Sequence, residues 1–116
     1  TDFLFLLREE GSATRQAMEK FMRELALIPR KNMSLTSNEA VKQSVIAGLG
    51  ISVMPIIGIR NELNEGNLQI IPTKGLPITT TWRLAWLKNK RFSPVAKAFL
   101  KHIQTHKLEL IEKAFT

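Results

Sequence analysis

The residues with the most suggestive chemistry lie in two short turns, each between an apolar segment and an amphipathic one. The first turn is residues 11–15 (GSATR), after the apolar run at 3–7. The second begins at residues 37–39 (SNE), after the short apolar segment at 33–36. Small hydroxylated residues at such positions are typical of helix N-termini, which attract carboxylates and phosphates because their N–H groups are unpaired.

The side chains of these turns add to that attraction. Ser12, Thr14 and Ser37 supply hydroxyl donors, and Arg15 supplies a cation that can bind an oxyanion with two hydrogen bonds. Helix capping alone explains Ser12 or Ser37 taken singly. Two such turns in one small domain favour a cleft for a small anionic or polar metabolite as much as they favour simple capping.

Other groups that could do chemistry have simpler explanations. His102 and His106 have the i, i+4 spacing of a metal-binding pair, but they lie in a basic segment and are better explained as surface histidines. Glu9 and Glu10 are adjacent in an extended segment, which favours turn charges over an acid–base pair. The chain has no cysteine and no nucleophile or phosphate-loop motif. We therefore expect no catalytic residue, no metal, no cofactor and no enzymatic activity.

Composition limits the remaining classes of protein. The chain has 116 residues, 44% hydrophobic and 23% charged, which suits one small globular domain. No apolar run approaches the roughly 20 residues of a membrane span, and nothing at the start resembles a signal peptide. We expect a cytoplasmic piece of a larger protein with no membrane partner. The net charge of +7 is concentrated in residues 83–116, where a solvated helix face is preferred to a DNA-binding surface.

The elements that must position the two turns alternate between strands and helices. Apolar runs predict strands at 3–7, 33–36, 51–54, 68–71 and 80–87. Caps and spacing predict helices after Ser12, after Ser37, over 56–64 and from Pro94 onward. This alternation predicts an α/β fold with a largely parallel sheet flanked by helices, in which both turns lie at the carboxyl edge of the sheet.

Several motifs occur together in an order that resembles one family. Residues 5–15 (FLLREEGSATR) are similar to the R-E-x-G-S-G-T-R pattern of LysR-type transcriptional regulators, with Ala13 where that pattern often has glycine. Residues 37–42 (SNEAVK) and 45–55 (VIAGLGISVMP) resemble its S-N-E-A-I-K and V-A-A-G-L-G-I-A-x-L-P blocks. Residues 62–68 (ELNEGNL) and 92–99 (FSPVAKAF) resemble later motifs. The match covers about residues 3–104.

The resemblance implies part of an effector-binding domain with the type II periplasmic-binding-protein-like fold. Residues 1–87 would be most of the second subdomain with the return crossover strand, and 88–116 the C-terminal helix that packs on the first subdomain. An effector in the cleft between the subdomains would shift the populations of two arrangements. DNA would be bound only by an N-terminal winged helix-turn-helix that this chain does not include. The effector-binding positions carried over are Gly11, Ser12, Thr14, Arg15, Ser37, Asn38, Met54 and Pro55.

Other functions remain open at this point. A solute-binding protein of a transporter shares the fold and is the main alternative, followed by an enzyme on the same fold and by DNA binding through the basic C-terminal helix. We also expect self-association into a dimer or higher oligomer, because the apolar stripe through Phe99, Ile103, Ile111 and Phe115 needs cover.

Overall fold

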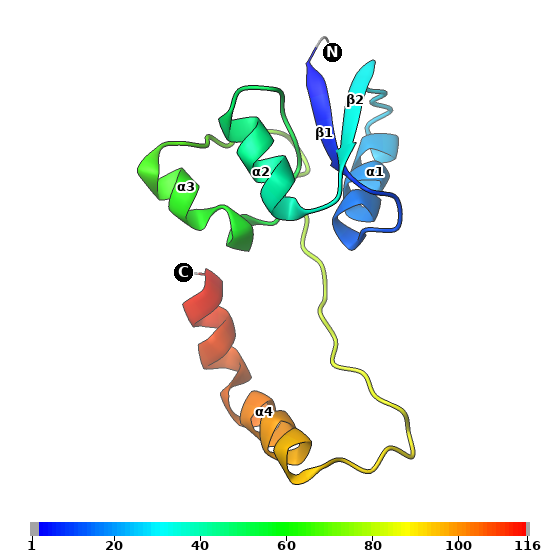
Figure 1. The fold of residues 1–116 in the computed structure, drawn as a ribbon, viewed down its shortest axis with the longest axis vertical. Coiled ribbons are helices and arrows are strands. Elements are labelled where there is room, and N and C mark those ends of the chain that lie inside the picture. Colours follow the sequence, from blue (N-terminus) through cyan, green and yellow to red (C-terminus); the bar gives the residue numbers. More distant parts are fainter. Residues whose placement is uncertain (1–2, 116) are drawn as a thin grey trace. The chain divides into compact units, whose positions relative to one another are not determined.

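The computed structural model describes residues 3–115, and these divide into two compact units, 3–78 and 79–115. The first unit, unit 1, contains β1 (Leu4–Arg8), α1 (Ala13–Glu24), β2 (Lys31–Leu35), α2 (Asn38–Ile46), the short 3₁₀ helix η1 (Ile56–Gly58) and α3 (Arg60–Glu65). The second, unit 2, contains α4 (Pro94–Phe115). Both candidate turns therefore belong to unit 1 (Figure 1).

The sheet of unit 1 is parallel and places β1 in its centre. β1 pairs with β2 in a register that sets Leu4 opposite Lys31 and Arg8 opposite Leu35. On its other side β1 forms an isolated parallel bridge from Phe5 to Ile51. The three segments run in the same direction, so their carboxyl ends share one edge of the sheet.

The core of unit 1 forms because both faces of β1 are covered. Leu7 packs in a cluster with three buried side chains of α1 (Met18, Phe21 and Met22). Leu6 is fully buried and points to the opposite face, because successive side chains of a strand alternate. On that face α2 contacts both strands and contributes buried Val41. Figure 1 shows α1 and α2 on opposite sides of the strand pair.

The predicted helix boundaries that depend on local signals are confirmed. Ser12 and Ser37 are the N-caps of α1 and α2. Gly48 follows the C-cap of α2 with φ +84°, and Gly66 ends α3 with φ +82°, a backbone region that favours glycine. Ser93 caps α4, since its hydroxyl accepts a hydrogen bond from the N–H of Ala96 at 3.2 Å.

Three predicted strands are wrong in the described part of the chain. The segment 51–54 forms only the bridge at Ile51, and neither 68–71 nor 80–87 is a strand. These sequences have strand composition, but a strand also needs a neighbour to take its backbone hydrogen bonds. None of the described residues pairs with either segment, and Trp82 is 81% exposed. The helix predicted over 56–64 is divided into η1 and α3.

Unit 2 has its own small apolar groove. The rings of Trp86 and Phe92 meet edge to face with centroids 5.5 Å apart, and the first turns of α4 line the groove with Phe99 and Leu100. Farther along α4, Leu108 and Ile111 are exposed. The side chain of Phe115 lies outside the described part of the structure. A long helix with exposed apolar residues at these positions has a surface that other protein can cover.

Candidate functional site

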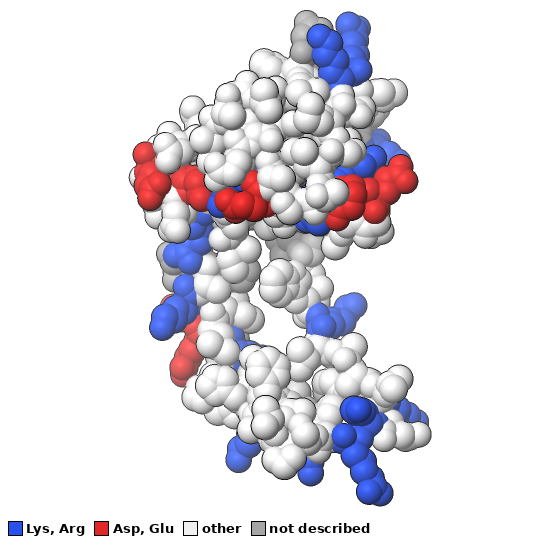
Figure 2. Space-filling view, in the orientation of Figure 1, with Lys and Arg blue, Asp and Glu red and all other residues white. Residues whose placement is uncertain are grey.

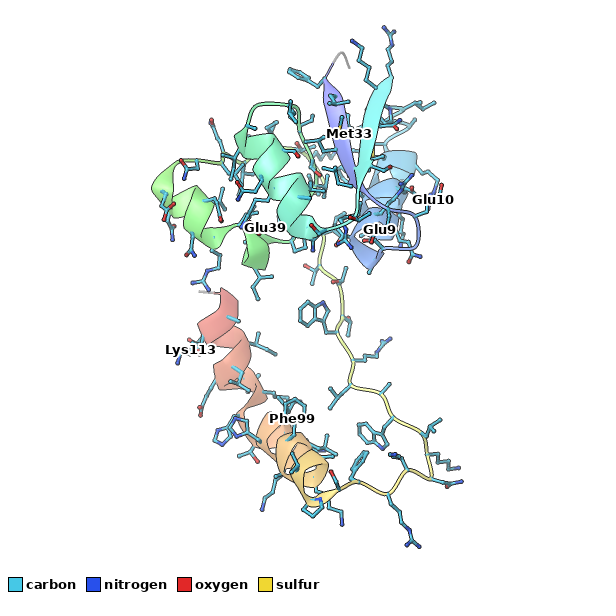
Figure 3. The ribbon with its side chains drawn as sticks, viewed as in Figure 1. Glu9, Glu10, Met33, Glu39, Phe99 and Lys113 are labelled. Carbon is cyan, nitrogen blue, oxygen red and sulfur yellow. The ribbon has the colours of Figure 1, made fainter. Side chains whose placement is uncertain are left out.

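The two turns meet at one edge of the sheet, as the parallel topology requires. β1 ends at Arg8 and leads through residues 9–12 into α1, whereas β2 ends at Leu35 and leads through 36–37 into α2. Because Arg8 and Leu35 are opposite each other in the register, the N-termini of the two helices follow from neighbouring positions. Figure 3 shows Glu9 and Glu39, one from each turn, at the same end of the strand pair. We call this region the carboxyl edge.

Both predicted serine caps have the expected geometry. The Ser37 hydroxyl oxygen accepts a hydrogen bond from the N–H of Ala40 at 3.0 Å, and the Ser12 hydroxyl accepts one from the N–H of Arg15 at 3.4 Å. Each hydroxyl retains its own O–H as a donor. Gly11 has φ +90°, and an added Cβ there would meet no atom within 4 Å, so backbone conformation rather than space favours glycine.

Arg15 is held by the protein itself. Its Nε donates to Glu19 Oε1 at 2.6 Å, and its Nη1 donates to the Arg8 carbonyl at 2.9 Å and to Ser34 Oγ at 3.1 Å. The side chain is only 15% exposed. The guanidinium therefore links α1 to the carboxyl ends of both strands.

Arg8 occupies a position at this edge that the sequence analysis did not include in the site. Its Nη1 donates to Asn38 Oδ1 at 2.8 Å, while its Nε and Nη2 donate to the two carboxylate oxygens of Glu9 at 3.0 and 2.7 Å. This pair raises the pKa of Arg8 and lowers the pKa of Glu9, mainly through the hydrogen bonds between them. An arginine ending a buried strand beside two capped turns is the signal that could have identified it.

Asn38 is thereby connected to the first turn, although it belongs to the second. Met54 and Pro55 follow the bridge at Ile51, and the parallel direction carries them toward the carboxyl edge. The Ser52 hydroxyl donates to the Leu6 carbonyl at 2.6 Å, which keeps this segment beside β1.

The N-terminal half of α2 also carries a charge cluster. Lys42 is mostly buried, and its Nζ lies 2.9 Å from Glu39 Oε2 and 2.8 Å from Glu62 Oε1. Hydrogen bonds from Lys42 lower the pKa of Glu39 and of Glu62, and these two carboxylates raise the pKa of Lys42. The cluster joins α2 to α3.

Figure 2 shows acidic side chains gathered along one side of unit 1, beside basic ones. At the carboxyl edge Arg8 faces Glu9, Arg15 faces Glu19 and Lys42 faces two glutamates. The cations at this edge are thus paired with internal carboxylates.

The described residues contain no group of three or more His, Cys, Asp or Glu side chains arranged to hold a metal ion. His102 and His106 lie on α4 with ring centroids 4.6 Å apart, and His106 Nδ1 is 3.6 Å from Glu109 Oε2. Among the helices of residues 3–115, none combines the length and the apolar character needed to span a bilayer.

Comparison with curated proteins identifies relatives that regulate transcription. The chain is 45% identical over 102 residues to the RuBisCO operon transcriptional regulator of Acidithiobacillus ferrooxidans, covering 88% of this chain and 33% of that protein. It is 38% identical over 101 residues to the HTH-type transcriptional activator CmpR of Synechocystis, covering 87% and 33%. The chain thus spans about a third of the length of these relatives. Their names give no support to the transporter alternative.

Comparison with solved structures identifies the same fold. The regulatory domain of CcmR from Synechocystis, in complex with 2-PG, matches with a TM-score of 0.81 and 32% identity, covering 90% of this chain and 50% of that domain. The regulatory domain of HypT from Salmonella typhimurium matches with a TM-score of 0.70, 20% identity and coverage of 92% and 51%, a likeness that shows the fold alone.

The fold class is therefore α/β of the type II periplasmic-binding-protein-like kind, as the sequence predicted. The family model described as the LysR substrate binding domain matches residues 1–107. The resemblance found in the motifs is confirmed: the chain belongs to the LysR substrate-binding domain family.

Proposed function

We propose that this chain is the effector-sensing part of a LysR-type transcriptional regulator and that it binds a small anionic metabolite at the carboxyl edge. The observation that carries the proposal is the meeting of two capped helix N-termini, those of α1 and α2, at the end of one parallel strand pair. A related regulatory domain, that of CcmR, is in complex with 2-PG, a small anionic metabolite.

In this proposal the eight positions of the sequence analysis act in different ways. The hydroxyls of Ser12, Thr14 and Ser37 face the anion with the N–H groups of Thr14 and Ser37, and Asn38 adds an amide beside them. Gly11 allows the first turn to form. Arg15 fixes the turns through its bonds to Arg8 and Ser34. Met54 and Pro55 extend the wall along the same edge.

The proposal also assigns separate roles to two parts of the chain. Residues 1–87 supply one wall of an effector cleft, and residues 88–116 supply a helix that packs on the opposite subdomain. The chain matches half of the CcmR regulatory domain, which is the share that one subdomain with a returning helix would cover. An effector that touches both walls favours the closed arrangement by its differential affinity.

The proposal also covers how the whole regulator binds DNA and associates with further copies of itself. DNA is contacted by a winged helix-turn-helix outside this chain, in the cytoplasm, and copies of the regulator associate through apolar surface such as that of α4. The exposed Val95, Leu108 and Ile111 support an interface of this kind.

The test is a calorimetric titration with 2-PG of the unaltered protein and of two matched variants. Ser37→Asp keeps a good N-cap but places a carboxylate where the anion binds, so the Kd should rise by about tenfold or more. Ser93→Asp makes the same change at the N-cap of α4, and its Kd should change by less than about twofold. Equal effects of the two substitutions, or no binding of 2-PG by the unaltered protein, would contradict the proposed function.

A further inference from the structure

The guanidinium of Arg8 lies between the two turns, at the last residue of β1. Its Nη1 is bound to Asn38 Oδ1, at the start of α2, and its side chain is 19% exposed. The Nε and Nη2 groups of Arg8 are bound side-on by both carboxylate oxygens of Glu9. This is the geometry in which arginine holds any oxyanion that presents two oxygens, whether it comes from the protein or from a ligand.

The other two cations of this edge are tied more firmly to the scaffold. Arg15 is bound to a backbone carbonyl and to side chains of α1 and β2, and Lys42 is bound by Glu39 and Glu62. Glu9 lies in the connecting turn, and its side chain is 41% exposed, much like that of Glu19 at 42%. The difference lies in the other bonds, because Arg15 also holds the Arg8 carbonyl and Ser34, and Lys42 also holds Glu62, which is 18% exposed. A partly exposed ion pair is weak, so an external oxyanion can replace Glu9 with little loss of stability.

We propose that Arg8 is the cation that binds the effector's oxyanion and that Glu9 is an internal competitor for the same two donors. This inference rests on the proposed function and adds a residue and a competition to it. The effector binds by displacing the Glu9 carboxylate from Arg8 while Asn38 keeps the guanidinium in place. The affinity for the effector is therefore set partly by the strength of the Arg8–Glu9 pair.

Two further features support this competition. Glu9 is ionised at neutral pH, as glutamates ordinarily are, and the hydrogen bond from Arg8 lowers its pKa further, so its carboxylate carries the full competing charge. The Glu9 carbonyl also accepts the N–H of Ser12 at 3.3 Å, which connects the displaced residue to the cap of α1. Displacement of Glu9 is thus a movement within the first turn itself.

The test compares two neighbouring glutamates by calorimetry with 2-PG. Glu9→Gln removes the competing charge, and the Kd for 2-PG should fall by about fivefold. Glu10→Gln removes the same charge one residue away, where the side chain is 91% exposed and 4.0 Å from Arg15, and its Kd should change by less than about twofold. Arg8→Gln should raise the Kd for 2-PG by about tenfold. Arg8→Lys keeps the charge without the two parallel donors, so its Kd should lie between those of Arg8→Gln and the unaltered protein.

The outcomes separate this inference from the proposed function. If the unaltered protein binds 2-PG and Ser37→Asp weakens binding, but Glu9→Gln and Glu10→Gln behave alike, the competition is overturned and the proposed function stands. If Arg8→Gln binds 2-PG as the unaltered protein does, Arg8 does not contact the anion. If the unaltered protein does not bind 2-PG, the proposed function and the competition at Arg8 are both overturned. Thermal unfolding of each variant shows that it is folded.

Discussion

Among the single residues, Arg15 links α1 to β1 and β2. Its guanidinium reaches the carbonyl that ends β1 and the Ser34 hydroxyl of β2 while its own helix supplies Glu19. The bidentate chemistry expected from the sequence is therefore directed at protein acceptors. The guanidinium of Arg8 is bound differently. One of its nitrogens donates to Asn38, and the other two donate to the partly exposed carboxylate of Glu9.

Replacement of Arg15 by glutamine should destabilise unit 1. The loss of two charge-assisted hydrogen bonds to Arg8 and Ser34 should lower the free energy of unfolding by about 2 kcal/mol, measured by urea denaturation. Lys20→Gln, an exposed position on the same helix, should change it by less than about 0.5 kcal/mol. Equal stability of the two variants would show that Arg15 does not hold the turns.

At the scale of elements, unit 1 depends on close approach of the chain to β1 at Gly50. A Cβ added at Gly50 would overlap the backbone carbonyl of Leu4, beside the bridge that Ile51 makes with β1. Gly50→Ala should therefore lower the free energy of unfolding by about 2 kcal/mol and speed hydrogen exchange at the Leu6 amide, which is bonded to the Ile51 carbonyl at 2.9 Å.

Gly58→Ala provides the matched control for this prediction. A Cβ at Gly58 would meet no atom within 4 Å, and its φ is not in the region reserved for glycine, so the change should be nearly neutral. Equal unfolding midpoints for the two alanine variants would contradict the close approach at Gly50.

Elements that are specified by local signals could be predicted from the sequence, whereas those that depend on a distant neighbour could not. The caps at Ser12, Ser37 and Ser93 define helix starts because the side chain bonds its own backbone. The segment 80–87 has an alternating pattern but has no partner strand among the described residues, so its alternation did not produce a strand.

The meeting of the two turns could be predicted from the sequence, whereas the contacts of their side chains could not. Parallel topology brings the turns after β1 and β2 to one edge whatever the side chains do there. Which arginine is bound to both strands and which is bound to a partly exposed carboxylate depends on distances between residues up to 30 positions apart, such as Arg8 and Asn38. No periodicity or spacing in the sequence encodes those distances.

For the whole molecule, the net charge of +7 is not the source of the anion binding proposed at the carboxyl edge. Residues 83–116 carry most of that excess, whereas the cations of the carboxyl edge are paired with glutamates. Under the proposed function, attraction there comes instead from oriented N–H groups of two helices and from Arg8, whose partner Glu9 the effector would replace. Binding is therefore expected to depend on the local geometry of unit 1.

Effector binding at the carboxyl edge can be tested directly by amide NMR of the protein during titration with 2-PG. Binding at the carboxyl edge should produce saturable shifts at the amides of residues 9–15 and 37–40, including Ser12 and Ala40, with smaller changes at the distant end of the sheet near Lys31. Saturable shifts confined to residues 79–116, or no saturable shift at the two turns, would contradict the claim that the carboxyl edge binds the effector.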